Sequence, residues 1–181
     1  ETVQCVYKPV AGEQPLWDFP DGTLAGREYS SFLISEALGW NVVPHTVIRE
    51  GPGGTGMVQM WVDQPEKPAS PALVDLCPAD RVPEGYISIL TAYDYAGDEV
   101  TLVHADDPQL RRMAVFDLIV NNADRKGGHI LTAEDGAVYG VDHGIALHVQ
   151  DMLRTVRWGW AGTAIDDDTL IALRNLQERL R

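Results

Sequence analysis

NNADRKGGHIL at residues 121–131 precedes VDHG at residues 141–144, and a short predicted hairpin separates the two stretches. Asp124 and Asp142 therefore lie 18 residues apart, at opposite ends of that hairpin, which can bring their carboxylates close together. Phosphoryl transfer needs two such groups: one orients or deprotonates the acceptor, and the other holds Mg²⁺ against the nucleotide phosphates. The pattern predicts a phosphoryl-transfer site. The alternative interpretation is a solvated turn rich in Asp, Asn and Gly.

Helices are predicted on both sides of this centre. Between residues 107 and 121, the positions Leu110, Met113, Ala114, Asp117 and Leu118 recur at helical spacing. A second helix is predicted at 166–180, which begins with three aspartates and ends with arginines. Short strands are predicted at 130–132 and 138–141.

The N-terminal part predicts strands around one helix. Strands are expected at 3–9, 42–49 and 56–62, with a loop at 11–22, a helix at 26–38 and a glycine-rich hairpin turn at 50–56. Residues 63–98 are rich in Pro, Ala and Asp, which predicts a connector with short helical pieces. The fold class is therefore expected to be α+β, with a sheet-rich N-lobe at 1–65, a helical C-lobe at 66–181 and a boundary near 62–71.

Three further features are candidates for nucleotide binding. Lys8 ends an apolar strand, where its ammonium could bridge phosphates as a strand lysine does in protein kinases. Glu28 lies on the next predicted helix and could hold that lysine extended. The strand that ends at Val62 enters the connector, where backbone groups of Met60 and Val62 could bind adenine. The alternatives are an exposed lysine, a solvated helix carboxylate and an ordinary core strand.

Composition restricts the partners. The 181 residues include 27 acidic and 14 basic side chains, a net charge of −13, which repels nucleic acid and anionic membranes. Cys5 and Cys77 form no disulfide framework, which favours a reduced, cytoplasmic location. The first residues do not read as a signal peptide, since they lack a basic head and an apolar stretch, and no apolar run approaches about 20 residues. Because the chain does not start with Met, we expect that it begins inside a longer protein.

Six segments that carry these candidates follow one another in order: VYKP at 6–9, GREY at 26–29, VPHT at 43–46, VQMWV at 58–62, FDLIVNNADR at 116–125 and VDHG at 141–144. This order resembles the phosphatidylinositol 3-/4-kinase-like superfamily over roughly residues 3–148. It is most similar to the type II phosphatidylinositol 4-kinases and their small bacterial relatives of the kind found in actinobacteria. The resemblance implies a two-lobed, protein-kinase-like fold that binds ATP and Mg²⁺.

The resemblance also implies a role for each residue. Lys8 would bind phosphate with Glu28 as its partner, and the hinge would hold adenine. Asp124, at the start of Asp-Arg-Lys, would be the catalytic aspartate. Asp142, at the start of Asp-His-Gly, would be the metal aspartate. The predicted site therefore comprises the catalytic-loop residues Asp124, Arg125 and Lys126, the ATP-binding residues Lys8, Glu28, Gln59, Met60, Trp61 and Val62, and the metal ligands Asp142 and His129.

Two features depart from the family pattern. The family usually has Asn five residues after the catalytic Asp, and here that position is His129. Since imidazole suits Mg²⁺ poorly, this change favours weaker metal binding, a shift toward Mn²⁺, or a metal held by Asp142 alone. The glycine-rich phosphate cover expected before Lys8 is absent from the sequence given, and we expect it upstream of Glu1.

The acceptor is expected in the segment after Asp142, at 145–160. Arg154 and Arg157 could bind one phosphate, with Trp158 and Trp160 beside them or packed in the core. Because the net charge opposes contact with an anionic membrane, a protein or small-molecule acceptor is favoured over a phosphoinositide. ATP hydrolysis, a nucleotide-binding pseudokinase that acts as scaffold or sensor, and an interaction domain without nucleotide are the alternatives.

Overall fold

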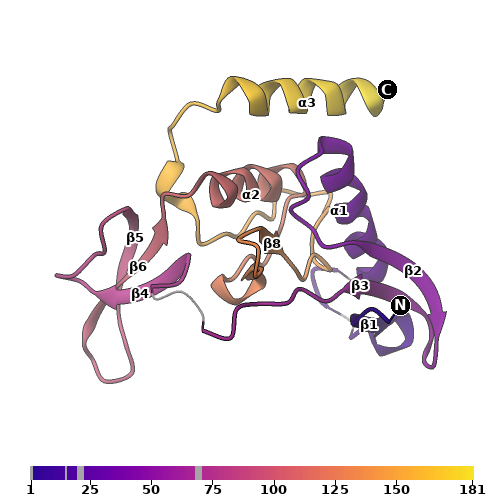
Figure 1. Ribbon diagram of the computed structural model, residues 1–181, viewed down its shortest axis with the longest axis horizontal. Helices are drawn as coiled ribbons and strands as arrows, with labels where there is room; N and C mark the ends of the chain where they lie inside the picture. Colours follow the sequence, from indigo (N-terminus) through magenta and orange to yellow (C-terminus); the bar gives the residue numbers. More distant parts are fainter. Residues whose placement is uncertain (1, 15, 20–22, 68–70) are drawn as a thin grey trace.

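The computed structural model describes residues 2–14, 16–19, 23–67 and 71–181. Within these residues the chain is mixed α+β, with three α-helices and three small antiparallel sheets. Figure 1 shows the sheets spread along the long axis of the molecule, with α2 between them and α3 above it. The α+β class expected from the sequence is confirmed.

The first sheet contains β1 (Cys5–Pro9), β2 (Thr46–Gly51) and β3 (Gly54–Met60), in the order β1-β3-β2. A 3₁₀ turn, Val10–Gly12, follows β1, and α1 (Leu24–Leu38) ends at Gly39, whose φ of 67° suits glycine. The predicted strands and helix are confirmed, although β2 begins four residues later than expected. The predicted loop at 11–22 includes residues 15 and 20–22, which lie outside the described part of the chain.

The second sheet was not predicted from the sequence. Residues 63–98 were expected to form a connector with short helices, but they hold β4 (Val74–Pro78) and β5 (Tyr86–Tyr93), which pair on either side of β6 (Glu99–Ala105). Among the described residues, the Pro, Ala and Asp residues that suggested a connector lie largely outside the strands, before β4 and in the turns. The pairing partner β6 lies beyond the segment considered, so local composition concealed the sheet. Residues 68–70 lie outside the described chain.

The remaining elements match their predictions closely. They are α2 (Pro108–Ile119), β7 (Ile130–Thr132), β8 (Val138–Gly140) and α3 (Asp167–Arg179), with 3₁₀ turns at Gly127–His129 and Trp158–Trp160. Asp107 caps α2, because its carboxylate accepts hydrogen bonds from Gln109 N at 2.8 Å and Leu110 N at 2.9 Å. Asp166 caps α3 in the same way, through Thr169 N at 2.8 Å.

The hydrophobic core lies among the three helices. Its buried members come from α1, the segment after it, α2, the loop after β8 and α3: Phe32, Leu38, Val42, Val43, Phe116, Val120, Ala146 and Leu176. This core therefore joins residues on both sides of position 65. It also holds α1 against the segment that carries Asp142. None of the described helices has the length and apolar character needed to cross a bilayer.

Candidate functional site

Lys8, Glu28 and Asp142 meet at the centre of the candidate site. The Lys8 ammonium lies 2.9 Å from Glu28 Oε1 and 2.8 Å from Asp142 Oδ1. The predicted Lys8–Glu28 pair is therefore confirmed. Lys8 and Asp142 were both assigned to one predicted nucleotide site, and the structure brings these two side chains into contact. The Glu28 side chain is buried, whereas Lys8 and Asp142 are 45% and 51% exposed, so a ligand can reach both.

Strand geometry explains why Lys8 points into the molecule. In the antiparallel register, Lys8 lies opposite Met57, and Val6 lies opposite Gln59. Cross-strand partners project from the same face of a sheet. Met57 and Gln59 are buried, so Lys8 shares the inward face of the sheet, toward α1. Its neighbours Tyr7 and Pro9 project to the other face.

Neighbouring charges stabilise the ionised forms of Lys8 and Asp142. Burial would lower the pKa of Lys8, but the carboxylates of Glu28 and Asp142 together outweigh it and raise that pKa above its usual value. Burial would raise the pKa of Asp142. The hydrogen bond from Lys8 and its positive charge reverse this and hold the pKa below its usual range. Both groups are therefore charged at neutral pH.

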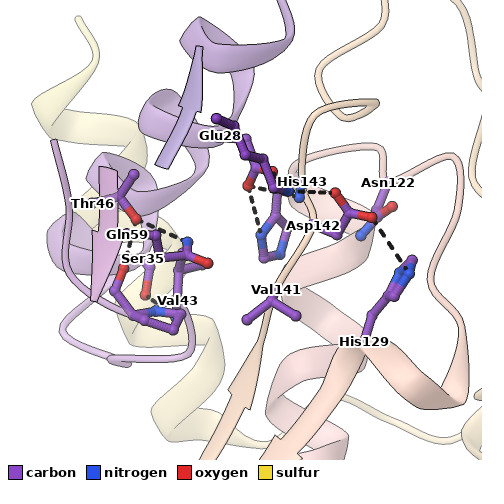
Figure 2. A network of polar contacts seen from close by, with 12 residues as sticks. Glu28, Ser35, Val43, Thr46, Gln59, Asn122, His129, Val141, Asp142 and His143 are labelled. Carbon is purple, nitrogen blue, oxygen red and sulfur yellow. Dashed lines mark hydrogen bonds and ion pairs between the residues drawn. The ribbon is translucent and has the colours of Figure 1, made fainter. Parts of the chain in front are cut away.

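Glu28 also fixes the backbone of the Asp-His-Gly turn. Its second oxygen, Oε2, accepts a hydrogen bond from His143 N at 2.9 Å, and Figure 2 shows the Glu28 carboxylate beside this turn. Asp142 has a φ of 63°, in the left-handed region that non-glycine residues seldom adopt. Such a conformation persists when the surrounding contacts over-determine it, and it is concentrated at functional sites. One carboxylate of α1 thus orients both the lysine and the strained aspartate.

His129 links Asp124 to Asp142. Its Nδ1 lies 3.0 Å from the Asp124 carbonyl oxygen, and its Nε2 lies 3.5 Å from Asp142 Oδ2. Because a carbonyl only accepts hydrogen bonds, Nδ1 carries a proton, which leaves Nε2 as the ring nitrogen that faces Asp142 and could bind a metal. Figure 2 shows the imidazole and the Asp142 carboxylate facing one another. This tautomer suits a metal ligand whose other nitrogen is held by a hydrogen bond.

Asp124 and Lys126 form the outer part of the loop between α2 and β7. Lys126 Nζ lies 2.6 Å from Asp124 Oδ2, and this hydrogen bond raises the pKa of Lys126. Asn122 Oδ1 accepts a hydrogen bond from Asp124 N at 3.0 Å, which fixes the turn. The Lys126 side chain is largely exposed and Asp124 is partly exposed. Both can therefore contact an acceptor that arrives from solvent.

Arg125, predicted as a catalytic residue, lies in the interior instead. Its side chain is fully buried and bonds Asp117, which also accepts hydrogen bonds from Asn122 and Arg157. A guanidinium with no exposed surface cannot contact an acceptor from solvent. It instead joins α2 to the loop that follows this helix.

Arg125 also contacts the turn that carries Asp142. It donates to Val141 O at 2.8 Å, and its Nη2 lies 2.6 Å from His143 Nε2. Gly140 leaves room for this contact, because a Cβ there would lie 2.9 Å from Arg125 Nη2. Arg125 thus positions the turn on either side of Asp142.

Arg157 corrects the expectation for the acceptor segment. We expected Arg154 and Arg157 to bind one phosphate together, but Arg157 is buried against Asp117 and only Arg154 is exposed. Burial lowers the pKa of Arg157 to about 9 and that of Arg125 to about 10, so both stay charged at neutral pH. The sequence offered one clue to this cluster, because Asp117 occupies a position in the apolar stripe of its helix. A carboxylate there requires a buried partner.

Two cavities share Lys8 and Asp142. The first, which we name the hinge cavity, has a volume of about 320 Å³ and lies beside the predicted hinge. The second, named the helix cavity, has a volume of about 360 Å³ and lies beside the start of α1. The hinge cavity is lined by Val6, Lys8, 59–62, Gln64, His129, Leu131, Val141 and Asp142. The helix cavity is lined by 7–9, 12–14, Leu24, Ala25, Glu28, Met57, Asp142 and Gly144.

The hinge residues contribute unequally to their cavity. The Gln59 side chain donates to Thr46 Oγ1 at 2.9 Å in the interior, as Figure 2 shows. Met60 N donates to His45 O at 2.8 Å and Trp61 N donates to Gln4 O at 3.0 Å. The Met60 N–H, one of the predicted adenine contacts, is therefore already used. Among the described residues, Val62 N has no recorded partner and is the remaining backbone donor of the predicted pair.

Metal binding by protein groups alone is not supported. In the described part of the chain, no group of three or more His, Cys, Asp or Glu side chains is placed to hold an ion. Mg²⁺ in nucleotide sites is usually bound by one or two carboxylates, with phosphates and water completing the shell. Asp142 with His129 fits such a partial site, in which a cation would arrive with a nucleotide.

Comparison with known proteins gives one relative. No family model and no solved structure matches this chain. Over 185 aligned residues, 99% of its length, the chain is 63% identical to Protein Rv2133c of Mycobacterium tuberculosis, and the alignment covers 66% of that protein. The chain thus spans slightly less than two thirds of the relative's length. The name of the relative states no activity. What the comparison establishes is close similarity between this chain and most of Protein Rv2133c.

Proposed function

We propose that this chain is an atypical kinase-like protein that binds ATP in the hinge cavity. In this proposal it transfers the γ-phosphoryl group to a protein or small-molecule acceptor, or to water. The observation that carries the proposal is the Lys8 ammonium, held within 2.9 Å of Glu28 and 2.8 Å of Asp142 where two cavities meet. A strand lysine paired with a helix glutamate beside a metal aspartate is the arrangement that protein kinases require for activity. The proposal includes a two-lobed kinase-like fold with lobes at 1–65 and 66–181, and a cytoplasmic location.

The adenine would enter the apolar end of the hinge cavity. Val6, Leu131 and Val141 line that cavity and offer flat apolar contacts for a base. In this proposal Val62 N would be the backbone donor to an adenine ring nitrogen. The polar end of the same cavity contains Lys8, His129 and Asp142, which would face the phosphates.

The phosphate end of the site would hold a divalent cation. Asp142 Oδ2 and His129 Nε2 would hold it together with the nucleotide phosphates, and the cation would neutralise phosphate charge. Lys8 would bind a phosphate oxygen while Glu28 keeps the side chain extended. Imidazole prefers transition metals, so Mn²⁺ should support binding at least as well as Mg²⁺.

Asp124 and Lys126 would act on the acceptor. The acceptor oxygen forms a bond to the γ-phosphorus as the bond from that phosphorus to the β,γ-bridging oxygen breaks, and ADP departs. The acceptor hydroxyl proton passes to the Asp124 carboxylate. Lys126, which lies 2.6 Å from Asp124 without ligand, would balance the charge of the transferring group.

A nucleotide-binding pseudokinase is the second candidate, and His129 is the observation that favours it. The imidazole stands where the resembling family has a metal-binding Asn, and it already contacts Asp142. Such a protein would bind ATP as a scaffold or sensor without turnover. A phosphatidylinositol kinase is a weaker alternative, because a net charge of −13 opposes docking on an anionic membrane.

Thermal denaturation with nucleotide tests the binding part of the proposal. ATP at about 100 times its dissociation constant should stabilise the wild type by about 2.7 kcal/mol. The series uses ATP with Mg²⁺ or Mn²⁺. Lys8→Met should weaken the shift and Asp142→Asn should reduce its metal dependence. Lys67→Met, at an exposed lysine that lines neither cavity, is the matched control. A flat melting curve under every condition would favour an interaction domain without nucleotide.

Turnover distinguishes the kinase from the pseudokinase. Asp124→Asn should retain the ATP-dependent thermal shift but lose formation of ADP from ATP, because this carboxylate acts only on the acceptor. Wild-type binding without any ADP formation would support the pseudokinase. If Asp124→Asn turns over ATP at the wild-type rate, the role assigned to Asp124 is wrong.

A further inference from the structure

The sheet of β4, β6 and β5 projects from the rest of the molecule, as Figure 1 shows at one end of the long axis. Its register places His104 beside Val74 and Ile87, and Leu102 beside Leu76 and Leu90. Cross-strand partners share a face, so these residues lie on one face of the sheet.

The inner end of this face packs on the body. Gly159 lies so close that a Cβ there would be 2.4 Å from His104 Nε2 and 2.6 Å from Ile87 Cγ2. The Trp160 ring lies with its centroid 4.2 Å from that of His104. The chain therefore covers the inner third of the face with its own 158–160 segment.

The outer part of the same face is apolar and uncovered. Leu76 is 60% exposed and Leu90 is 52% exposed, on either side of Leu102 in one cross-strand row. The next row continues the apolar character with residues Pro78, Val100 and Ala92. We name this surface the outer apolar face: Leu76, Pro78, Leu90, Ala92, Val100 and Leu102.

The opposite side of the sheet is already buried along its centre. Cys77, Thr101 and Val103, which alternate with the outer apolar face along their strands, are all buried. Antiparallel sheets commonly cover one face and expose a polar one, whereas the exposed face of this sheet is apolar. An uncovered apolar surface rimmed by polar residues commonly marks an interaction site.

Charge identifies the class of partner. Residues 71–103 contain six acidic side chains and a single basic one, Arg81. In the turn between β5 and β6, just beyond the outer apolar face, the exposed Tyr95 stands with Asp94 and Asp98, whereas Tyr93 and Glu99 pair on the opposite face. Tyrosine is enriched at protein interfaces because it provides a large contact at low entropic cost. The surface is thus an apolar centre with a tyrosine-bearing, acidic rim.

We propose that the outer apolar face is a docking surface for a partner protein with an apolar centre and a basic rim. Like charge opposes a second copy of this chain, since each copy carries −13 and the projecting sheet is itself acidic. The same charge repels nucleic acid and anionic membranes. This surface is separate from the nucleotide site, so the proposal does not depend on the kinase function.

Site-specific photo-crosslinking identifies the partner. p-Benzoylphenylalanine replaces Leu90 in the full chain inside the organism that makes it, and replaces the exposed Val149 as the matched control. We expect a crosslinked protein at position 90 that is absent at position 149. That protein is then purified and its dissociation constant for the unmodified chain is measured.

Variants of the chain then test the chemistry of the surface. Leu90→Asp and, independently, Leu76→Asp should weaken binding roughly tenfold or more, as expected for central interface residues. Asp98→Lys should slow association and reduce its salt dependence, whereas Asp151→Lys, an exposed acid outside this sheet, should leave both unchanged. Leu90→Asp should keep the wild-type melting temperature and ATP response, while Lys8→Met should keep partner binding.

Several results would overturn the proposal. They are no crosslink above the Val149 control, a crosslink only between copies of this chain, or capture of nucleic acid, lipid or a protein without a basic surface. Unchanged affinity of folded Leu90→Asp and Leu76→Asp for the captured protein would do the same. Loss of ATP binding in Lys8→Met with partner binding intact would leave this proposal standing.

Discussion

Replacing Asp117 by Asn should be among the most destabilising single changes to the interior of this protein. The carboxylate contacts two arginine side chains that are both fully buried, so the cluster contains two positive charges and one negative charge. Arg125 has other acceptors, the carbonyls of Val141 and His129. Arg157 has only long contacts of 3.4 Å to Leu110 O and Met113 O, and its Nε has no partner among the described residues.

The expected loss follows from this imbalance. Removing one member of a buried ion pair typically costs about 3–5 kcal/mol, since the remaining charge is left without a partner. That is a large part of the roughly 5–15 kcal/mol by which a domain is stable. Arg157→Met should cost less, about 1–2 kcal/mol, because it leaves Asp117 and Arg125 as a neutral pair. Asp117→Asn combined with Arg157→Met should be less damaging than the sum of the two single changes.

Guanidinium chloride unfolding, followed by tryptophan fluorescence and far-ultraviolet circular dichroism, measures these free energies. Asp151→Asn, at an exposed acid, is the control and should change stability by less than about 0.5 kcal/mol. If Asp117→Asn does not fold, the comparison of Arg157→Met with the double variant still tests the charge argument. A loss below about 1 kcal/mol for Asp117→Asn would refute the reasoning. So would equal losses for Asp117→Asn and Arg157→Met.

Three further predictions concern pH, packing and capping. Burial holds the pKa of His143 well below its usual 6.5 and also lowers the pKa of His104. These two imidazoles take up protons when the protein unfolds, so the free energy of unfolding should fall as the pH drops below about 6.5. Denaturant midpoints at about pH 7, 6 and 5 measure this loss, and His143→Gln should flatten the slope by up to about 1.4 kcal/mol per pH unit. Gly159→Ala should lower the free energy of unfolding by about 1–3 kcal/mol, because its Cβ would lie 2.4 Å from Nε2 of buried His104. An unchanged denaturant midpoint would contradict this close packing. Asp166→Ala should cost about 1 kcal/mol by removing the cap on Thr169 N at 2.8 Å, and Asp168→Ala, in the exposed first turn, is its comparison.

Local patterns predicted the elements that surround the candidate site. Helical spacing, aspartates at a helix start and a glycine that ends a helix are properties of neighbouring residues. The ends of α1, α2 and α3 were therefore predicted to within a few residues. The pairing of Lys8 with Glu28 could also be anticipated, because a lysine that ends a strand and a glutamate on the following helix were considered together. The sheet of β4, β5 and β6 was missed, since its pairing joins strands whose intervening turns dominate the composition.

The interior ion cluster shows the limit of reasoning from residue types. Arginine commonly binds phosphate, so Arg125 and Arg157 were both assigned to the site. Nothing in the residues next to them in the sequence shows whether each guanidinium contacts a ligand or a buried carboxylate. Asp117 decides between the two, but it lies eight residues before Arg125 and 40 before Arg157 in the chain. Only packing of α2 against both loops brings the three side chains together.

The sequence by itself determined the α+β class, the order of helices and strands near the site, and the residues able to carry charge there. Those properties follow from periodicity, capping and side-chain chemistry, which act over a few residues. The tertiary structure alone decided which charges face solvent, that the Met60 N–H is already occupied, and that Lys8 meets Asp142 across 134 residues of chain. Burial and hydrogen-bond partners depend on segments distant in sequence, so they are established only when the chain packs.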